Sequence, residues 1–275
     1  MQRLFITALV CLMSVSVCGQ NTQSMDFEYG EHHNIYIDYS PDFNMSTFTI
    51  SFDIYPRSYC WSGNSACESC PLSRYGTGNE VIRTGFDTNV FYVDLLNDNA
   101  DVLSVVYDSP LPLNAWTNIA FSYDNQTLNL YINGVLVDTA NDIDFVINTS
   151  STSGVSIGEL FAGNGNWYNL DGLLDNIFIW NVLLNQEEIN YIIECPVYNG
   201  EDGLITLFDF EEGISGNIVL DASQNGTYGT VNGASLSTEV PGFNCTNELQ
   251  HDSNNDGCVD VDDFLQLLVE YGQCE

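Results

Sequence analysis

The sequence predicts an all-β fold, a sandwich of two antiparallel sheets, and the first observation that predicts it is a strand pattern in residues 116–123. Thr117, Ile119, Phe121 and Tyr123 alternate with smaller or polar residues, which is the period-2 pattern of a strand with one face turned to a core. Asp124-Asn125 then predicts a turn, because both residues tolerate turn conformations.

The second observation is a hairpin signal that follows directly. Residues 127–132 alternate again and end in Asn133-Gly134. Asn-Gly is the strongest short hairpin signal, because a type I′ turn needs positive φ at both central residues. Residues 135–138 are therefore expected to run back antiparallel. The third observation is that these three strands form a meander with one apolar face, which a second sheet must cover.

Further alternating runs predict the other strands. Residues 47–55 place Phe48, Ile50, Phe52 and Ile54 on one face, and residues 172–180 are apolar on both faces, which predicts a central strand. Shorter strands are expected on both sides of a Tyr29-Gly30 turn, and at 80–83, 90–96 and 101–107. Residues 148–165 are expected to be a loop with an apolar core at 155–157.

A short helix is expected at 185–193. Asn185 is a good N-cap residue, and Glu188 stands three positions later, which completes a capping box. The adjacent His32 and His33 are expected in a surface turn rather than in a metal site, because neighbouring side chains of a strand point to opposite faces.

Three segments resemble a known family: WTNIAFSYD, LNLYINGVLVD, and LDGLLDNIFIWNVLLNQEEI at 170–189. They are similar to the laminin G-like, concanavalin A-like jelly-roll superfamily, in the form common among secreted bacterial proteins. The resemblance covers residues 24–245 and implies a two-sheet jelly roll that often binds carbohydrate or acts in adhesion. It implies no particular ligand.

Residues 203–234 resemble the segment that usually opens such a domain, although here they come last. This order implies a permuted arrangement, in which residues 204–210 return to complete the sheet beside the N-terminal strands. The alternative is a loosely attached extra hairpin.

Residues 1–19 have the marks of a signal peptide. Arg3 precedes an apolar run at 4–13, and Val17-Cys18-Gly19 suits cleavage before Gln20. A lipoprotein would acylate Cys18, but Val17 stands where a small residue is expected, so a cell-surface lipoprotein is the less favoured alternative. No later run reaches the roughly 20 apolar residues of a membrane helix. The mature protein is expected to be secreted.

Charge is the most extreme feature of the composition. The chain has 38 Asp and Glu against 4 Lys and Arg, for a net charge of -34. Nucleic-acid binding needs clustered cations, so it is not expected. Anionic membranes and acidic polymers are disfavoured as well. The acidity can keep an exported protein soluble, and some of the carboxylates can bind Ca²⁺; for at least one stretch both can be true.

The chain has nine cysteines, and two of them lie in the predicted signal, which leaves an odd number of seven. Cys60, Cys67 and Cys70 crowd one segment, where one local disulfide and a spare thiol are expected. Cys195 and Cys245 bracket one segment and are candidates for a disulfide, and Cys258 and Cys274 are candidates for a staple in the tail.

No glycosidase pattern stands out. A retaining site needs two carboxyls about 5 Å apart, commonly in a Glu-x-Asp-x-x-Glu run, and the chain has no such run. Asp171 and Asp175 would lie about 13 Å apart along one strand. The protein is therefore not expected to be an enzyme.

Loop aromatic and amide residues offer the chemistry of sugar binding, because aromatic faces stack on C–H groups and amides bind hydroxyls. Trp61 and Tyr75 belong to this set. The richest stretch is residues 163–168, with the candidate ligand-binding residues Asn164, Asn166, Trp167 and Tyr168. The alternative is an ordinary glycine-rich connector with Trp167 folded onto the core.

The last residues, 250–275, contain the most specific motif, DSNNDGCVDVDD followed by an amphipathic helix. It fits an EF-hand-type Ca²⁺ loop, with Gly257 at the sharp turn and the backbone carbonyl of Cys258 at position 7. The candidate ligands are Asp252, Asn254, Asp256, Cys258, Asp260 and Asp263. Asp263 in place of Glu at position 12 resembles the dockerin repeat. A dockerin has two repeats and this chain has one, so half of the surface for a cohesin-like partner is missing.

The sequence thus favours a secreted, non-catalytic carbohydrate-binding or adhesive module with a calcium-binding tail. The alternative is a structural or protein-binding module in extracellular or cell-surface assembly. A concanavalin-like glycoside hydrolase is the third hypothesis.

Overall fold

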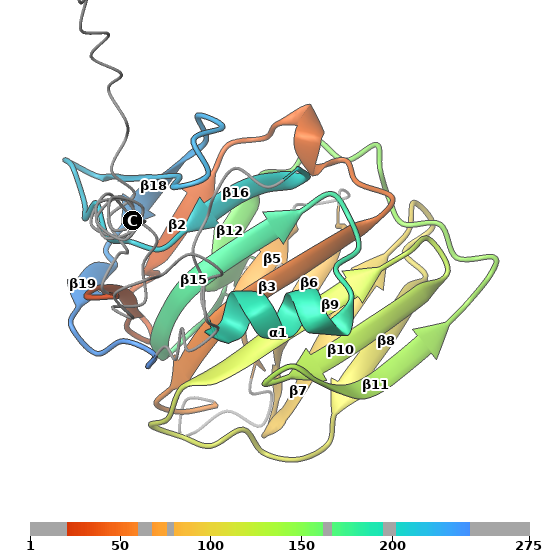
Figure 1. Ribbon diagram of the computed structural model, residues 1–275, viewed down its shortest axis with the longest axis horizontal. Helices are drawn as coiled ribbons and strands as arrows, with labels where there is room; N and C mark the ends of the chain where they lie inside the picture. The colour runs from red at the N-terminus through yellow and green to blue at the C-terminus, as the bar shows by residue number, and fades with distance from the viewer. Residues whose placement is uncertain (1–20, 60–67, 76–79, 162–166, 195–201, 243–275) are drawn as a thin grey trace, which may run out of the picture. The chain divides into compact units, whose positions relative to one another are not determined.

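The computed structural model describes residues 21–59, 68–75, 80–161, 167–194 and 202–242. They form two antiparallel sheets packed face to face, with one α-helix on the outside of one sheet (Figure 1). The strands are β1 (Ser24–Phe27), β2 (Asn34–Ile37), β3 (Phe48–Pro56), β4 (Glu68–Ser69), β5 (Leu72–Arg74), β6 (Ile82–Asp87), β7 (Val90–Leu96), β8 (Val102–Tyr107), β9 (Thr117–Tyr123), β10 (Thr127–Ile132), β11 (Val135–Asn141), β12 (Val155–Ile157), β13 (Glu159–Phe161), β14 (Trp167–Asn169), β15 (Gly172–Trp180), β16 (Leu204–Phe208), β17 (Ile218–Leu220), β18 (Tyr228–Asn232) and β19 (Ser235–Ser237). The helices are the 3₁₀ helix η1 (Pro41–Phe43) and α1 (Gln186–Glu194).

Sheet A has eight strands in the order β11-β10-β9-β3-β15-β1-β19, with β16 paired to β15. Sheet B has nine strands in the order β17-β18-β2-β12-β5-β6-β7-β8, with β4 paired to β6. The strands β13 and β14 form a separate hairpin. The prediction of an all-β, two-sheet antiparallel sandwich of jelly-roll type is confirmed.

The core lies between the two sheets. Phe48, Ile50, Phe52 and Ile54 of β3 are at most 1% exposed, so the predicted inward face of this strand is correct. Burial of each such side chain contributes about 2 kcal/mol. Every residue of β15 is buried, and this strand bonds to β3 on one side and to β1 and β16 on the other, which confirms its predicted central position.

The predicted Asn-Gly hairpin is present. Asn133 and Gly134 have φ values of 48° and 72°, and Ile132 pairs with Val135 across the turn. Both central residues are left-handed, as a type I′ turn requires.

Helix α1 begins at the predicted capping box. Asn185 Oδ1 accepts the N–H groups of Glu187 (2.8 Å) and Glu188 (3.1 Å), while Glu188 Oε2 accepts the N–H of Asn185 (2.7 Å). The helix lies across the outer face of sheet A (Figure 1). Ile189 is buried there against Ala120 and Tyr131.

The prediction for residues 155–157 was wrong in part, because they form the strand β12 rather than the apolar centre of a loop. This strand lies inside sheet B, between β2 and β5. A three-residue run is too short to show alternation, and only its non-local partners define it as a strand. The strand expected at 80–83 also differs, since β6 begins at Ile82 and continues to Asp87.

The strand β16 completes sheet A, as expected, but it bonds to β15 rather than directly to the N-terminal strands. The strand β1 pairs with residues 172–174 of β15, and β16 pairs with residues 177–180 on the same edge. Beyond β16, Glu211 accepts the backbone N–H groups of Thr22 (2.8 Å) and Gln23 (3.0 Å). The N-terminal strand β1 and the late strand β16 therefore lie one after the other along the same edge of β15.

Cys70 is a free, buried thiol, and burial raises its pKa to about 12. The other cysteines of the predicted mature chain lie outside the described residues, as do the disulfides expected for them. Within the described part of the chain, no helix has the length and apolar composition needed to cross a membrane.

Candidate functional site

Polar and aromatic side chains gather on the outer face of sheet B, on strands β6 and β7. Arg83 lies opposite Asp94 in the register, and its Nε donates to Asp94 Oδ2 at 3.1 Å. The Cζ atom of Arg83 lies 5.7 Å from the centroid of the Tyr92 ring, a cation–π distance. Ser104 of β8 donates to Asp94 Oδ1 at 2.6 Å, so the Asp94 carboxylate is held from two sides.

A glycine makes room for one of these rings. Tyr92 pairs across the sheet with Gly85, where an added Cβ would lie 2.7 Å from the tyrosine hydroxyl oxygen. The ring can therefore lie over the strand instead of standing away from it.

Two tyrosines from distant parts of the chain join this face. The β13–β14 hairpin, which carries Tyr168, lies against β4 and β5, and Tyr75 directly follows β5. The pKa of Tyr75 is raised, first by burial and then by Glu80, while Arg83 opposes this effect and Tyr168 adds to it. We call Tyr75, Arg83, Tyr92, Asp94 and Tyr168 the Arg83 cluster.

Arg74 anchors the end of β5 that leads to the cluster. Its buried guanidinium donates to the backbone carbonyls of Phe43, Ser151 and Ser153 and to Asn44 Oδ1. Burial lowers the pKa of Arg74 to about 10. Because four acceptors surround this one side chain, the strand end has little freedom to move.

Glu159 holds the hairpin beside the cluster. Its buried carboxylate accepts from Asn34 Nδ2 (2.8 Å) and Asn169 Nδ2 (2.5 Å), and its Oε1 lies 2.9 Å from His32 Nδ1. His32 lies in a turn, as predicted, and there it contacts Glu159. The role of this carboxylate is structural, since both of its oxygens are used.

The structure thus brings together two of the aromatic residues that the sequence singled out, Tyr75 and Tyr168. Only the backbone of Trp167 is described, in β14. Trp61, Asn164 and Asn166 lie outside the described residues, as do the proposed calcium ligands of the tail. In the described ranges, no group of three or more His, Cys, Asp and Glu side chains could hold a metal ion.

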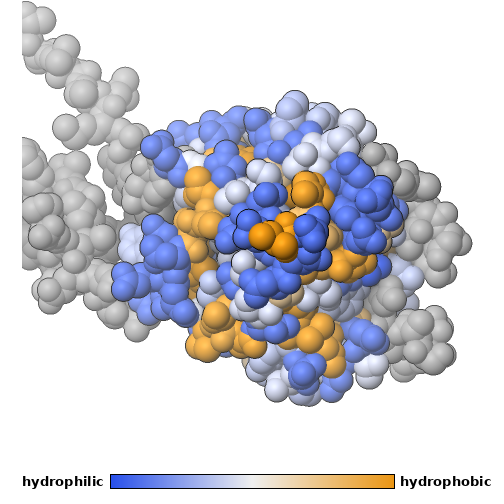
Figure 2. Space-filling model, turned by 90° about the vertical axis from the view of Figure 1, so that its right-hand side faces the viewer, coloured by the Kyte–Doolittle hydropathy of each residue, from blue (hydrophilic) through white to orange (hydrophobic). Residues whose placement is uncertain are grey.

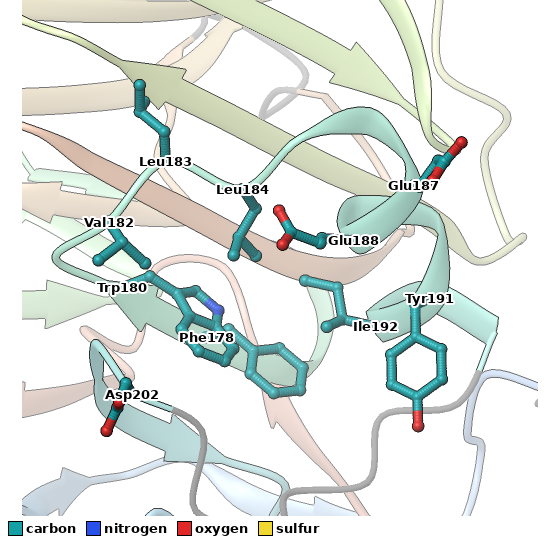
Figure 3. A pocket seen from close by; sticks show the side chains of 10 residues that line it. All are labelled: Phe178, Trp180, Val182, Leu183, Leu184, Glu187, Glu188, Tyr191, Ile192 and Asp202. Carbon is teal, nitrogen blue, oxygen red and sulfur yellow. The ribbon is translucent and has the colours of Figure 1, made fainter.

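A cavity of about 430 Å³ lies beside helix α1 on the outer side of sheet A (Figure 3). Its walls are the end of β15, residues 182–184, the helix and Asp202. Apolar side chains form most of the wall, and the charged groups that line it are all acidic.

Two buried carboxyls, Asp53 and Asp175, face each other across β3 and β15 of sheet A. Asp53 accepts from Asn118 Nδ2 and Asn176 Nδ2, each at 2.9 Å, and Asp175 accepts from Asn21 Nδ2 at 3.0 Å. Burial raises the pKa of Asp53 to about 6, and it also raises the pKa of Asp175. Because they are at most 6% exposed, neither carboxyl is placed to reach a glycosidic bond.

The edge formed by β8 and β11 carries exposed apolar side chains (Figure 2). The N–H of Val106 donates to Asp138 Oδ2 at 2.8 Å and so joins the two sheets at this edge. The exposed apolar residues are Val102 and Val106 of β8, Val135 and Leu136 of β11, and Ile143 and Val146 of the segment that follows β11. In Figure 2 the apolar areas are separated by hydrophilic ones.

Comparison with known proteins defines the class. The family model of the concanavalin A-like lectin/glucanases superfamily, in its Laminin_G_3 form, matches residues 30–190. This is more than half of the chain, so the protein belongs to this family. No curated protein matches the sequence.

Solved structures share the fold. One is a Bacteroides ovatus ATCC 8483 protein to which carbohydrate binding is provisionally assigned, with 16% identity and a TM-score of 0.65 over 81% of this chain and 61% of that one. This chain therefore spans about three fifths of its length. The botulinum neurotoxin serotype D binding domain is also similar, with 16% identity and a TM-score of 0.48 over 62% of this chain and 42% of that one.

Proposed function

We propose that this protein is an exported, non-catalytic binding module that recognises neutral carbohydrate through the Arg83 cluster. The observation that carries the proposal is a set of three partly exposed tyrosines: Tyr75 and Tyr92 lie beside Arg83, and Tyr168 lies near Tyr75. Tyrosine rings can stack on the C–H faces of a sugar, and their hydroxyls can bond to its hydroxyls.

The charges favour a neutral ligand. Arg83 is already paired with Asp94, so the cluster offers no free cation to an anionic sugar. The net charge of -34 also repels anionic polymers over distances of about a Debye length. Membership of a lectin and glucanase superfamily supports the carbohydrate class, and the burial of Asp53 and Asp175 supports binding without hydrolysis.

The test is a glycan array of neutral oligosaccharides, followed by titration of the best ligand. We expect Tyr168→Ala to weaken binding about five-fold to ten-fold, because one stacked ring contributes about 1 kcal/mol. Tyr228→Ala is the matched control, since Tyr228 is an exposed tyrosine of the same sheet on β18. Equal affinities of wild type and Tyr168→Ala would refute the assignment of the site.

A protein-binding role is the second candidate, and the exposed apolar edge of β8 and β11 favours it. Ile143 is 76% exposed at this edge. A silent glycan array, together with capture of an extracellular protein that Ile143→Asp abolishes, would support this role over the first.

We also propose that residues 252–263 bind one Ca²⁺ through their spaced oxygen ligands. Calorimetric titration of Ca²⁺ into the chelator-treated mature protein is expected to give one site, and Asp252→Ala/Asp256→Ala is expected to remove it. Heat that the double substitution leaves unchanged would contradict this assignment.

A further inference from the structure

The part of sheet B that carries the Arg83 cluster has a polar pair and an apolar pair side by side on its outer face. On β7 and β8, Asp94 pairs with Ser104, and two residues further along Tyr92 pairs with Val106. Directly opposite residues of an antiparallel pair point to the same face. Ser104 and Val106 are both exposed, so this face is the outer one. The two pairs therefore stand about 7 Å apart on one surface that solvent reaches.

Val106 is the open apolar part of this surface. Its side chain is 38% exposed. The hydroxyl of Tyr92 lies over Gly85 of β6, on the other side of β7 from Val106, so the tyrosine ring leaves the valine uncovered. The backbone N–H of Val106 is already bonded to Asp138 Oδ2 at 2.8 Å. Val106 therefore offers a ligand its methyl groups and no free N–H.

The polar pair beside it offers hydrogen bonds. Ser104 donates to Asp94 Oδ1 at 2.6 Å, so the exposed serine oxygen keeps its acceptor lone pairs for a ligand hydroxyl. A sugar whose hydroxyls bond to this pair would bring its exocyclic group over Val106. Contact with the valine favours an apolar exocyclic group, because a hydroxyl placed there would lose water without gaining a donor.

We propose that the sugar bound by the Arg83 cluster carries a methyl group, and that Val106 contacts this methyl and so determines specificity. This inference rests on the carbohydrate function proposed above. Two classes of neutral sugar share this chemistry, the 6-deoxyhexoses and the N-acetylhexosamines. Neither class is repelled by the net charge of -34.

The test uses three pairs of methyl glycosides in which the two sugars differ in one group. They are L-fucose and L-galactose, L-rhamnose and L-mannose, and N-acetyl-D-glucosamine and D-glucose. Each glycoside is titrated into the mature protein, and its Kd is measured by NMR. We expect the methyl-bearing member of at least one pair to bind about three-fold to ten-fold more tightly than the other member. A preference for fucose or rhamnose assigns the methyl of a 6-deoxy sugar, and a preference for N-acetylglucosamine assigns the acetyl methyl.

Val106→Thr replaces one methyl of the side chain with a hydroxyl and keeps the β-branched shape that suits a strand. It is expected to lower the affinity for the methyl-bearing sugar to that for its partner, without weakening the binding of the partner. Leu220→Thr is the matched control, since Leu220 is an exposed aliphatic residue of β17, at the other edge of the same sheet. The control is expected to keep the preference.

Equal affinities within all three pairs would overturn this inference and leave the carbohydrate function in place. A preference that Val106→Thr leaves intact would overturn it as well. Binding of none of these sugars, together with a silent glycan array, would contradict the carbohydrate function itself, and this inference with it.

Discussion

Replacing Gly158 with alanine is expected to destabilise the sandwich by about 2–5 kcal/mol. Gly158 joins β12 to β13 with a φ of +84°, and an added Cβ would lie 2.2 Å from Cδ1 of Phe27. Phe27 is fully buried, so its ring cannot move aside without disturbing the core. The left-handed backbone costs about 1–2 kcal/mol for alanine, and overpacking adds about 1–3 kcal/mol.

Gly30→Ala separates these two costs. Gly30 has almost the same φ, +81°, but an added Cβ would meet nothing within 4 Å. Its replacement is expected to cost only the backbone term. Denaturant unfolding measures the free energy of unfolding of the two variants. Equal losses of stability would contradict the close contact between Gly158 and the Phe27 ring.

The free energy of unfolding is expected to fall by about 2 kcal/mol as the pH rises from 4 to 6, because of Asp53. Burial raises the pKa of Asp53 from 3.8 to about 6 in the folded state, against two hydrogen bonds from Asn118 and Asn176 that lower it. Between these two pKa values the folded state binds more protons than the unfolded state. The stabilisation is therefore present at low pH and is lost as the pH rises through the window.

Asp175 acts in the same direction, since burial is also the largest cause of its raised pKa, and the charge of Asp53 adds to it. Repulsion among the many surface carboxylates has the same sign, so a variant must isolate the buried pair. Asp53→Asn is expected to flatten the pH dependence, while Asp144→Asn, at an exposed position, is expected to leave it unchanged. Urea unfolding at pH 4.5 and pH 7 measures how much the free energy of unfolding changes between these pH values. An identical change for wild type and Asp53→Asn would rule out this role.

The features that the sequence predicted correctly are local ones. The alternation of Phe48 to Ile54, the Asn133-Gly134 turn and the Asn185 capping box each depend on residues a few positions apart. The position of β12 and the pairing of β16 with β15 depend on partners far along the chain. No short window of sequence contains that information.

In the candidate site, too, some residues could be predicted from local sequence, while others are brought together only by long-range strand pairing. Tyr75 and Tyr168 were visible in the sequence as loop aromatics, but Arg83, Tyr92 and Asp94 belong to ordinary strands, and only the register brings them together. Gly85 was a possible signal, because a glycine inside a strand often marks a close approach.

The most direct test of the proposed function is a crystal structure of the mature protein with the oligosaccharide that binds best on the array. We expect a sugar ring stacked on Tyr75 or Tyr168, with at least one hydroxyl bonded to Arg83 or Asp94. Sugar density on sheet A or at the β8 and β11 edge, with the Arg83 cluster free, would contradict the assignment of the binding face.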